Sequence, residues 1–454
     1  MMSKKRALAA IAALSCLSAG CGINASPADL LRAPKLETKQ EEISQALASY
    51  LPPSARLVVP MRPANRSAVS QGDLDGDGQD EWIVFYKQDR NEYEIGTIIL
   101  KKTKDGWSKL PDIVGLAQDI DYFTIVDVTG DNRKELIIGY RGGQELEREL
   151  NVYSVTSTGL EQLWKQSYND MAVGDLDADQ VADIAILHHN HEQLTSSTEV
   201  YGFSNRSPYR KAQLATEGAI NGYEQAIIGQ AAPGKNGLFI DAGVGAHSAY
   251  TALLILKNGK LQNVFNENNN ETEQTFKPYA LASEDANHDG IIEIGVQREP
   301  AGSEEYAMAD MPWINVWHQW DGQHGLKPVM ETYAEYGVGY AFRIPERWIG
   351  KYTVQREREM ENGSVSFLYL NVYPKHKQKL LSILLYKRSD WAAAEESLKD
   401  QAGSYFILSE DKDKLIVAFL PTTHSTMAPR MEQEYNVLQL SKEEVKQLFQ
   451  INSF

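Results

Sequence analysis

A nine-residue acidic segment occurs four times in this chain, and each copy lies between two apolar runs typical of β-strands. The copies are "DLDGDGQDE" (73–81), "DVTGDNRKE" (127–135), "DLDADQVAD" (175–183) and "DANHDGIIE" (285–293). Their first residues are 54, 48 and 110 residues apart, and the last interval is two steps of 55. The sequence therefore predicts five repeats of about 50 residues, and the fourth repeat, around Gln230, lacks the acidic segment.

Each repeat also contains about four segments that alternate or run apolar in the manner of β-strands. Four strands in a repeat of this length predict the blades of a β-propeller. We therefore expect a mainly β fold, with a five-bladed propeller over residues 55–333. A strand at 55–61 is expected to close the ring by pairing with the last blade.

The first acidic segment shows why a metal ion is expected. Carboxylates within roughly 4–6 Å of one another repel unless a cation lies among them. Ca²⁺ binds about six to eight oxygen atoms, and alternate positions of a tight loop can turn their oxygens inward. The expected ligands in this segment are the side chains of Asp73, Asp75, Asp77 and Glu81, together with the carbonyl of Gln79.

The acidic segments, set between strands, resemble the calcium loops of FG-GAP (VCBS-type) repeats, which occur in integrin-like propellers and in secreted bacterial proteins. The resemblance covers about residues 65–330, although the Phe-Gly and Gly-Ala-Pro signatures of strict FG-GAP repeats are absent. It implies about four structural calcium ions. It extends the ligand set to Asp127, Thr129, Asp131, Glu135, Asp175, Asp177, Asp179, Asp183, Asp285, Asn287, Asp289 and Glu293. Thr129 replaces a carboxylate and should weaken the second site, and Ala178 replaces a glycine and should strain the third segment.

The N-terminus predicts export and lipid attachment. Three basic residues at 4–6 precede the apolar stretch 7–17, which is the pattern of a signal peptide over residues 1–20. The segment "LSAGC" (17–21) resembles a bacterial lipobox, so Cys21 is expected to carry the lipid at the outer face of the cell membrane. Ordinary cleavage that leaves Cys21 as a free thiol is the alternative. Residues 21–54 are expected to form a tether and a helix at 37–51.

A ligand surface is expected on the connections between the second and third strands of the repeats, because loops on a rigid scaffold often carry binding residues. The candidates are His188, His191, Asp241, His247, Ser248, Tyr306 and Trp313. The histidines could bind a transition metal or be solvated. Asp241, His247 and Ser248 are the residue types of a hydrolytic triad, but no nucleophile-elbow context surrounds the serine.

Residues 334–454 are expected to form an α+β domain, because the repeat stops after Tyr333. Asn362-Gly363 lies between alternating segments and predicts a hairpin turn. Segments 390–401 and 441–450 predict helices, with Asp390 and Ser441 as N-caps. No catalytic pattern is found in this region.

These features together predict a membrane-anchored, extracytoplasmic lipoprotein whose calcium-stabilised propeller binds a protein or a glycan, or serves in assembly. The formal net charge of −17 argues against nucleic acid as a partner. The alternative is an extracellular polysaccharide-acting enzyme, a lyase or a hydrolase, although a binding role is favoured over an enzyme. A sensor subunit localised by its lipid is a third interpretation.

Overall fold

The computed structural model describes residues 38–454 apart from 64–66, 90, 144–147, 157–158, 266–273, 324, 371–377, 423–427 and 452–454. The expected signal peptide and Cys21 lie outside these residues. Within the described chain, none of the helices combines the length and the apolar character needed to cross a bilayer.

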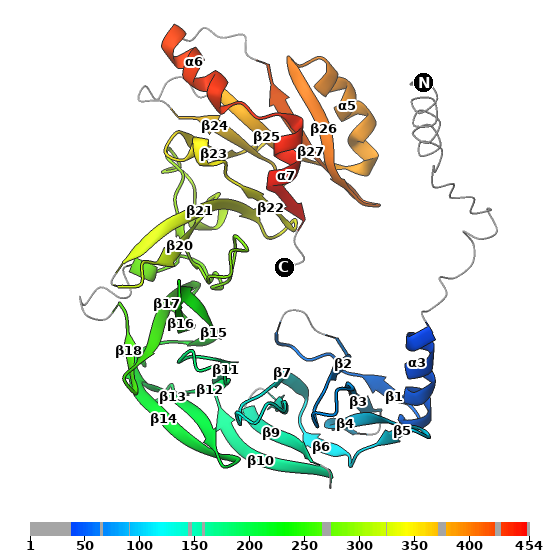
Figure 1. The fold of residues 1–454 in the computed structure, drawn as a ribbon. Coiled ribbons are helices and arrows are strands. Elements are labelled where there is room, and N and C mark those ends of the chain that lie inside the picture. The colour runs from blue at the N-terminus through cyan, green and yellow to red at the C-terminus, as the bar shows by residue number, and fades with distance from the viewer. Residues whose placement is uncertain are drawn as a thin grey trace, which may run out of the picture.

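The described chain is mainly β, and its strands form six antiparallel sheets (Figure 1). The first sheet contains β1 (Ala55–Leu57), β2 (Val69–Gly72), β3 (Glu81–Gln88), β4 (Asn91–Thr103), β5 (Gly106–Lys109) and β6 (Ile113–Leu116). Helix α3 (Thr38–Tyr50) precedes it and packs Ile43 and Leu47 against Val84 and Ile98. The helix expected at 37–51 is therefore confirmed.

The next three sheets each contain four strands in sequence order, as the repeat predicts. They are β7 (Asp119–Val126), β8 (Glu135–Arg141), β9 (Arg148–Thr156) and β10 (Gly159–Tyr168); β11 (Asp170–Gly174), β12 (Asp183–Asn190), β13 (Thr195–Ser204) and β14 (Ser207–Thr216); and β15 (Gly222–Ala232), β16 (Lys235–Val244), β17 (Ser248–Lys257) and β18 (Lys260–Asn263). The last of these sheets is the repeat without an acidic segment, because a short turn at 233–234 joins β15 to β16.

The fifth sheet combines β19 (Ile294–Arg298), β20 (Ile314–Trp320), β21 (Leu326–Glu335), β22 (Tyr340–Arg343) and β28 (Phe449–Ile451). The sixth contains β23 (Tyr352–Arg356), β24 (Val365–Tyr369), β25 (Gln378–Lys387), β26 (Gly403–Glu410) and β27 (Lys414–Pro421). Short 3₁₀ helices lie at Met308–Asp310, Glu346–Trp348 and Arg388–Asp390. The α-helices of this part are α5 (Trp391–Lys399), α6 (Pro429–Leu438) and α7 (Lys442–Leu448).

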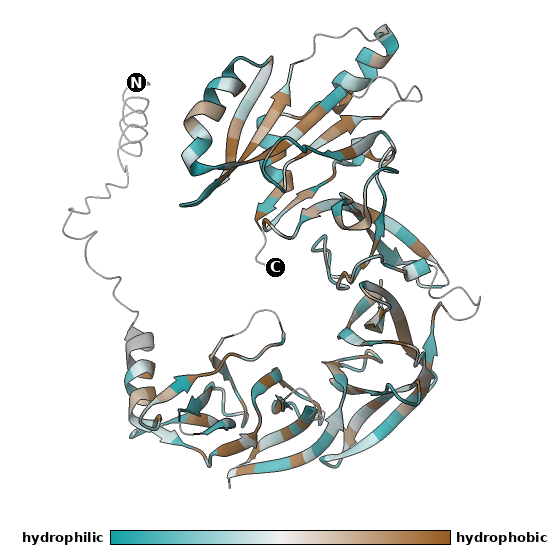
Figure 2. Ribbon diagram, turned by 180° about the vertical axis from the view of Figure 1, so that it is seen from behind, coloured by the Kyte–Doolittle hydropathy of each residue, from teal (hydrophilic) through white to brown (hydrophobic). Residues whose placement is uncertain are grey.

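Apolar cores form between consecutive sheets. Phe85 of the first sheet packs with Phe123 of the second, and corresponding clusters join the second sheet to the third, the third to the fourth and the fourth to the fifth. Glycine at the end of an inner strand permits the close approach: a Cβ on Gly174 would lie 2.9 Å from the Ile228 side chain. The apolar residues concentrate on the strands, and the turns are largely hydrophilic (Figure 2).

The prediction of a five-bladed propeller is wrong. The sheets are separate, none closes on itself, and together they follow an open arc (Figure 1). The expected ring-closing strand, β1, pairs with β3 of the first sheet, and the following Met61 amide donates to the Ile120 carbonyl at 2.8 Å. At the other end of the arc, β22 pairs with both β21 and β28. The strand edges needed for closure are therefore already paired with other strands.

The C-terminal segment follows its sequence signals at several points. Hairpin strands β23 and β24 flank the Asn362-Gly363 turn. Helix α7 begins with a capping box in which the Ser441 side chain accepts from the Glu444 amide and Glu444 accepts from the Ser441 amide. Helix α5 follows Asp390, whose side chain makes no capping bond. Helix α6 was not expected from the sequence.

Candidate metal loops and the adjoining cavity

The four acidic segments form loops with one shared backbone geometry; we call them loop 1 (73–81), loop 2 (127–135), loop 3 (175–183) and loop 4 (285–293). The position-1 aspartate accepts hydrogen bonds from amides within its own loop. In loop 1, Asp73 accepts from Gly76 at 2.8 Å and from Gly78 at 2.9 Å. In loop 2 the donors are likewise the amides of positions 4 and 6, and in loops 3 and 4 they are the amides of positions 5 and 6. The turn is therefore determined within the nine residues.

Positions 4 and 6 of every loop have a positive φ. These residues are Gly76, Gly78, Gly130, Asn132, Ala178, Gln180, His288 and Gly290. Ala178 has φ +63°, a conformation that costs an L-residue about 1–2 kcal/mol. The strain expected in loop 3 is therefore confirmed.

The closing carboxylate at position 9 is buried in every loop. Glu81, Glu135, Asp183 and Glu293 are each no more than 1% exposed. One oxygen of each accepts the amide of position 2, at distances from 2.8 to 3.2 Å. Burial raises the pKa of Glu81 and of Glu135 to about 7 and that of Asp183 to about 6, and it also raises the pKa of Glu293.

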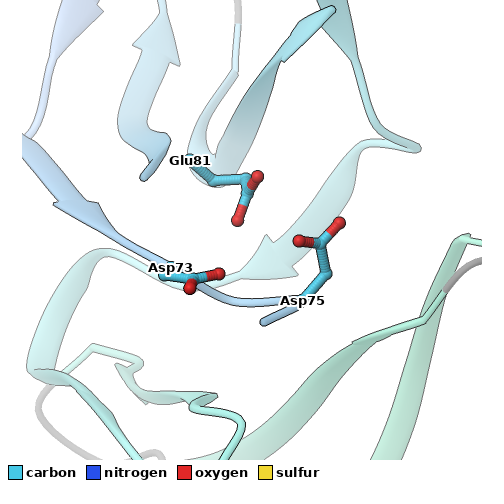
Figure 3. Close-up of side chains that lie close together, drawn as sticks. All are labelled: Asp73, Asp75 and Glu81. Carbon is cyan, nitrogen blue, oxygen red and sulfur yellow. The ribbon is translucent and has the colours of Figure 1, made fainter. Parts of the chain in front are cut away.

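Three of the loops bring three carboxylates together, with one oxygen of each within 4.8 Å of the others. The groups are Asp73, Asp75 and Glu81; Asp175, Asp177 and Asp183; and Asp285, Asp289 and Glu293. Figure 3 shows the loop 1 carboxylates converging from the two sides of the turn. Such a set of oxygen donors fits a hard divalent cation such as Ca²⁺.

Loop 2 differs from the others because Thr129 offers a hydroxyl where loops 1 and 3 have a carboxylate. Its Asp131 is paired with Arg133, whose Nη2 lies 2.5 Å from Oδ2, and Arg206 lies 3.7 Å from the same oxygen. Loop 2 forms no three-carboxylate group among the described residues.

The remaining expected ligands lie in the same turns. Asp77 accepts the Gln79 amide at 2.8 Å, which places Gln79 beside the loop 1 carboxylates. In loop 3, Asp179 accepts the Val181 amide at 2.8 Å. In loop 4, the Asn287 side chain donates to Asp289 at 3.1 Å and to Glu293 at 3.0 Å.

The candidate ligand-surface residues do not form one site. Asp241 is 2% exposed, and its Oδ1 accepts from the Lys277 ammonium at 2.8 Å and from Thr251 Oγ1 at 2.5 Å. The Ser283 amide donates to Asp241 Oδ2 at 2.7 Å. Asp241 is therefore part of a buried polar network, whereas Ser248 is the first residue of β17.

His188 lies near the end of β12, and His191 directly follows that strand. His188 Nε2 is 3.7 Å from Glu199 Oε2, and the ring of His191 contacts His189 at a centroid distance of 6.0 Å. Tyr306 lies elsewhere: its hydroxyl accepts the Arg356 amide at 3.2 Å. No shared metal-binding arrangement of the histidines is found in the part of the chain that the structure describes.

His247 and Trp313 are brought close by Tyr279, which the sequence analysis missed. The His247 ring stacks on Tyr279 at 5.7 Å, and Tyr279 meets Trp313 edge to face at 6.3 Å. His247 is exposed, and the other two side chains are half-buried. We call these three residues the aromatic cluster.

A cavity of about 590 Å³ lies between the fifth sheet and the segment 280–288. This segment directly follows Tyr279 of the aromatic cluster in the sequence. Asn315 and Trp317 of β20 contribute to its lining, together with Glu284 and Asp285 from the start of loop 4. Tyr336, which is 48% exposed, also lines it. The sequence showed no signal for this cavity because its lining comes from four separate segments.

No protein-family model matches this chain, and no curated protein matches it. Solved structures similar to it include rhamnogalacturonan lyase YesW, at 14% identity and a TM-score of 0.32 over 71% of this chain and 67% of that one. A Bacillus licheniformis rhamnogalacturonan lyase, PL11, matches at 11% identity and 0.32, over 71% and 68% of the two chains. The exotype rhamnogalacturonan lyase YesX matches at 11% and 0.30, over 78% and 81%. TM-scores this low carry no inference about this chain.

Proposed function

We propose that this protein is an exported, lipid-anchored binding module whose acidic loops are stiffened by divalent cations, with Ca²⁺ as the preferred ion. The observation that carries the proposal is the recurring loop geometry, in which a buried closing carboxylate meets the other carboxylates of its loop. The donors are oxygen atoms, and flexible carboxylate sets suit Ca²⁺ better than the smaller, strictly octahedral Mg²⁺. The resemblance to FG-GAP or VCBS repeats is proposed at the level of these loops alone.

The cations have a structural role in this proposal. Each loop lies directly before a core strand, β3, β8, β12 or β19, so neutralising its carboxylates stabilises the sheet that follows. An ion present at 100 times its dissociation constant stabilises the folded state by about 2.7 kcal/mol per site.

Calcium uptake and thermal stability test this part of the proposal. Protein treated with a chelator and then dialysed against CaCl₂ should retain calcium in stoichiometric amounts by elemental analysis, and its unfolding midpoint should rise. The variant Asp75→Asn/Glu81→Gln should take up less calcium than the wild type. The proposal fails if the protein retains no calcium and a chelator leaves the midpoint unchanged.

Lipid attachment at Cys21 is proposed from the sequence. Metabolic labelling with an alkyne fatty acid should mark the wild type and not Cys21→Ser, and the variant should lose its association with the membrane fraction. Equal labelling of the two proteins would rule out this cysteine as the anchor.

The ligand, a protein or a glycan, is expected at the cavity and at the aromatic cluster, whose Tyr279 directly precedes the cavity-lining Ala280 in the sequence. The cavity is concave and combines aromatic side chains with amide and carboxyl groups, as small-ligand and chain-binding sites commonly do. Capture of ligands from glycan panels and from cell-surface extracts should weaken in Tyr336→Ala and Tyr279→Ala. Tyr93→Ala, which removes a 66% exposed tyrosine of the first sheet, is the matched control.

A polysaccharide-acting enzyme is the second candidate function. It is favoured by Glu284, an acidic residue in the lining of the cavity together with Trp317 and Tyr336, because glycoside cleavage commonly uses carboxyl groups. The test is product release from a panel of polysaccharides, compared with Glu284→Gln. Binding without turnover by the wild type would favour the binding module.

A further inference from the structure

The four loops share a backbone geometry but differ in the side chains that neutralise their carboxylates. In loop 1, Lys101 reaches from β4 into the turn. Its Nζ contacts Asp75 Oδ2 and lies 3.0 Å from Asp77 Oδ2. The lysine side chain is charged at neutral pH, so it brings a positive charge into the loop.

Loop 3 contains the same arrangement, built from a different strand. Lys211 of β14 places its Nζ 2.9 Å from Asp177 Oδ2 and 2.7 Å from Asp183 Oδ1. Asp179 Oδ2 lies 3.5 Å from the same nitrogen. The Lys211 side chain is only 13% exposed, so its ammonium is held among the carboxylates and away from bulk water.

Loop 4 is the internal comparison, because the side chain that reaches into it is neutral. Gln319 of β20 donates to Asp289 Oδ2 at 2.8 Å and to Glu293 Oε1 at 2.7 Å. Among the described ion pairs, none joins a basic side chain to Asp285, Asp289 or Glu293. Loops 1 and 3 therefore contain an internal cation, and loop 4 contains an amide in the corresponding region.

The lysine does not complete loop 1. Glu81 is 1% exposed and converges with Asp73 and Asp75 (Figure 3), yet its Oε1 has no hydrogen-bond partner among the described residues. A buried carboxylate oxygen left unpaired is costly. This oxygen points to a further positive ligand in the same loop.

We propose that Lys101 and Lys211 are built-in counter-charges that compete with a divalent cation for loops 1 and 3. The inference rests on the proposed function. Calcium and an ammonium group that share carboxylates repel each other, so binding of the ion must weaken or break the lysine's contacts. Loops 1 and 3 therefore bind calcium more weakly than their carboxylate number implies, and the lysine keeps the loop neutralised when calcium is scarce.

Calcium titration by isothermal calorimetry tests this inference on the wild type, Lys101→Met and Lys211→Met. Each methionine variant should gain about ten-fold or more in the affinity of one site. In a chelator, each should unfold at a lower temperature than the wild type, because its carboxylates have lost their counter-charge. Lys101→Arg keeps the charge and should behave as the wild type does. Lys104→Met, an exposed lysine beyond β4, controls for the change in net charge.

The outcomes separate the two levels of the proposal. Stoichiometric calcium binding with equal affinities in the wild type and both methionine variants would overturn the counter-charge inference and leave the metal loops standing. No calcium binding by any of the proteins would overturn both. A gain of affinity in Lys104→Met equal to that in Lys101→Met would also refute the inference, since it would trace the gain to net charge. Loops 1 and 3 lie in different sheets, so one variant that fails to fold leaves the other as the test.

Discussion

Replacing Asp241 by asparagine should destabilise the protein strongly, because this side chain neutralises the most deeply buried lysine of the described chain. Lys277 is 0% exposed, and its Nζ lies 2.8 Å from Asp241 Oδ1. Removing one partner of a buried ion pair costs about 3–5 kcal/mol. Both Asp241 oxygens accept hydrogen bonds. In the asparagine variant one of them is replaced by an NH₂ group, which would face another donor and could not accept its hydrogen bond.

The two contributions together predict a loss of about 4 kcal/mol or more, which for a chain of 454 residues corresponds to a fall of about 4 °C or more in the unfolding midpoint. Differential scanning calorimetry of the wild type and Asp241→Asn measures this fall. The double variant Asp241→Asn/Lys277→Met should recover part of it, because the unpaired charge is then absent. Asp413→Asn is the matched control: its carboxylate is 79% exposed and 3.9 Å from Lys412, and its loss should leave the midpoint unchanged.

The reasoning is refuted if the unfolding midpoint of Asp241→Asn lies within about 1 °C of that of the wild type, because the expected shift is several times larger. A double variant less stable than Asp241→Asn alone would likewise show that the buried charge is not the source of the loss. The expected result would also assign a structural role to Asp241, which the sequence analysis names as a candidate for the ligand surface.

Four further substitutions test the backbone and a buried titratable group. Gly218→Ala would place a Cβ against the Leu194 carbonyl oxygen and should cost about 1–3 kcal/mol; an unchanged unfolding midpoint would contradict this. Ala178→Gly removes an L-residue from φ +63° and should raise the midpoint of the chelated protein, whereas Gly130→Ala, at the same loop position, should lower it. Burial lowers the pKa of His318 below about 6.5, so the unfolded state binds more protons. The stability that neutral His318 contributes is present above this pH and is lost as the pH falls. The unfolding midpoints of the wild type and of His318→Gln should therefore differ by an amount that changes between pH 8 and pH 5. A constant difference over this range would contradict the prediction.

The loops were the most predictable part of the molecule. Their hydrogen bonds run from position 1 to positions 4–6 and from position 9 to position 2, so the residues that determine the turn lie within nine positions of one another. The positive φ at positions 4 and 6 also follows from local chemistry, and Ala178 shows that the other hydrogen bonds outweigh the preference of a single residue.

The global arrangement was not predictable in the same way. The repeat correctly indicated four-stranded sheets, but a period alone does not say whether stacked sheets close into a ring. Closure depends on which partners the terminal strands find, and here β1 pairs with β3 while β22 pairs with β28. The repeat pattern does not predict either pairing, because β1 and β28 lie outside the repeated four-stranded units.

The sequence by itself determined the number of acidic loops, their spacing and the strands on either side, because these depend on short-range hydrogen bonds and on alternation along single strands. Only the tertiary structure decided that Lys101 and Lys211 enter two of the loops, that Asp241 neutralises Lys277, and that a cavity forms beside loop 4. The physical reason is that these contacts cross between strands. Their formation depends on strand register and on burial summed over many residues, neither of which is encoded at any single position.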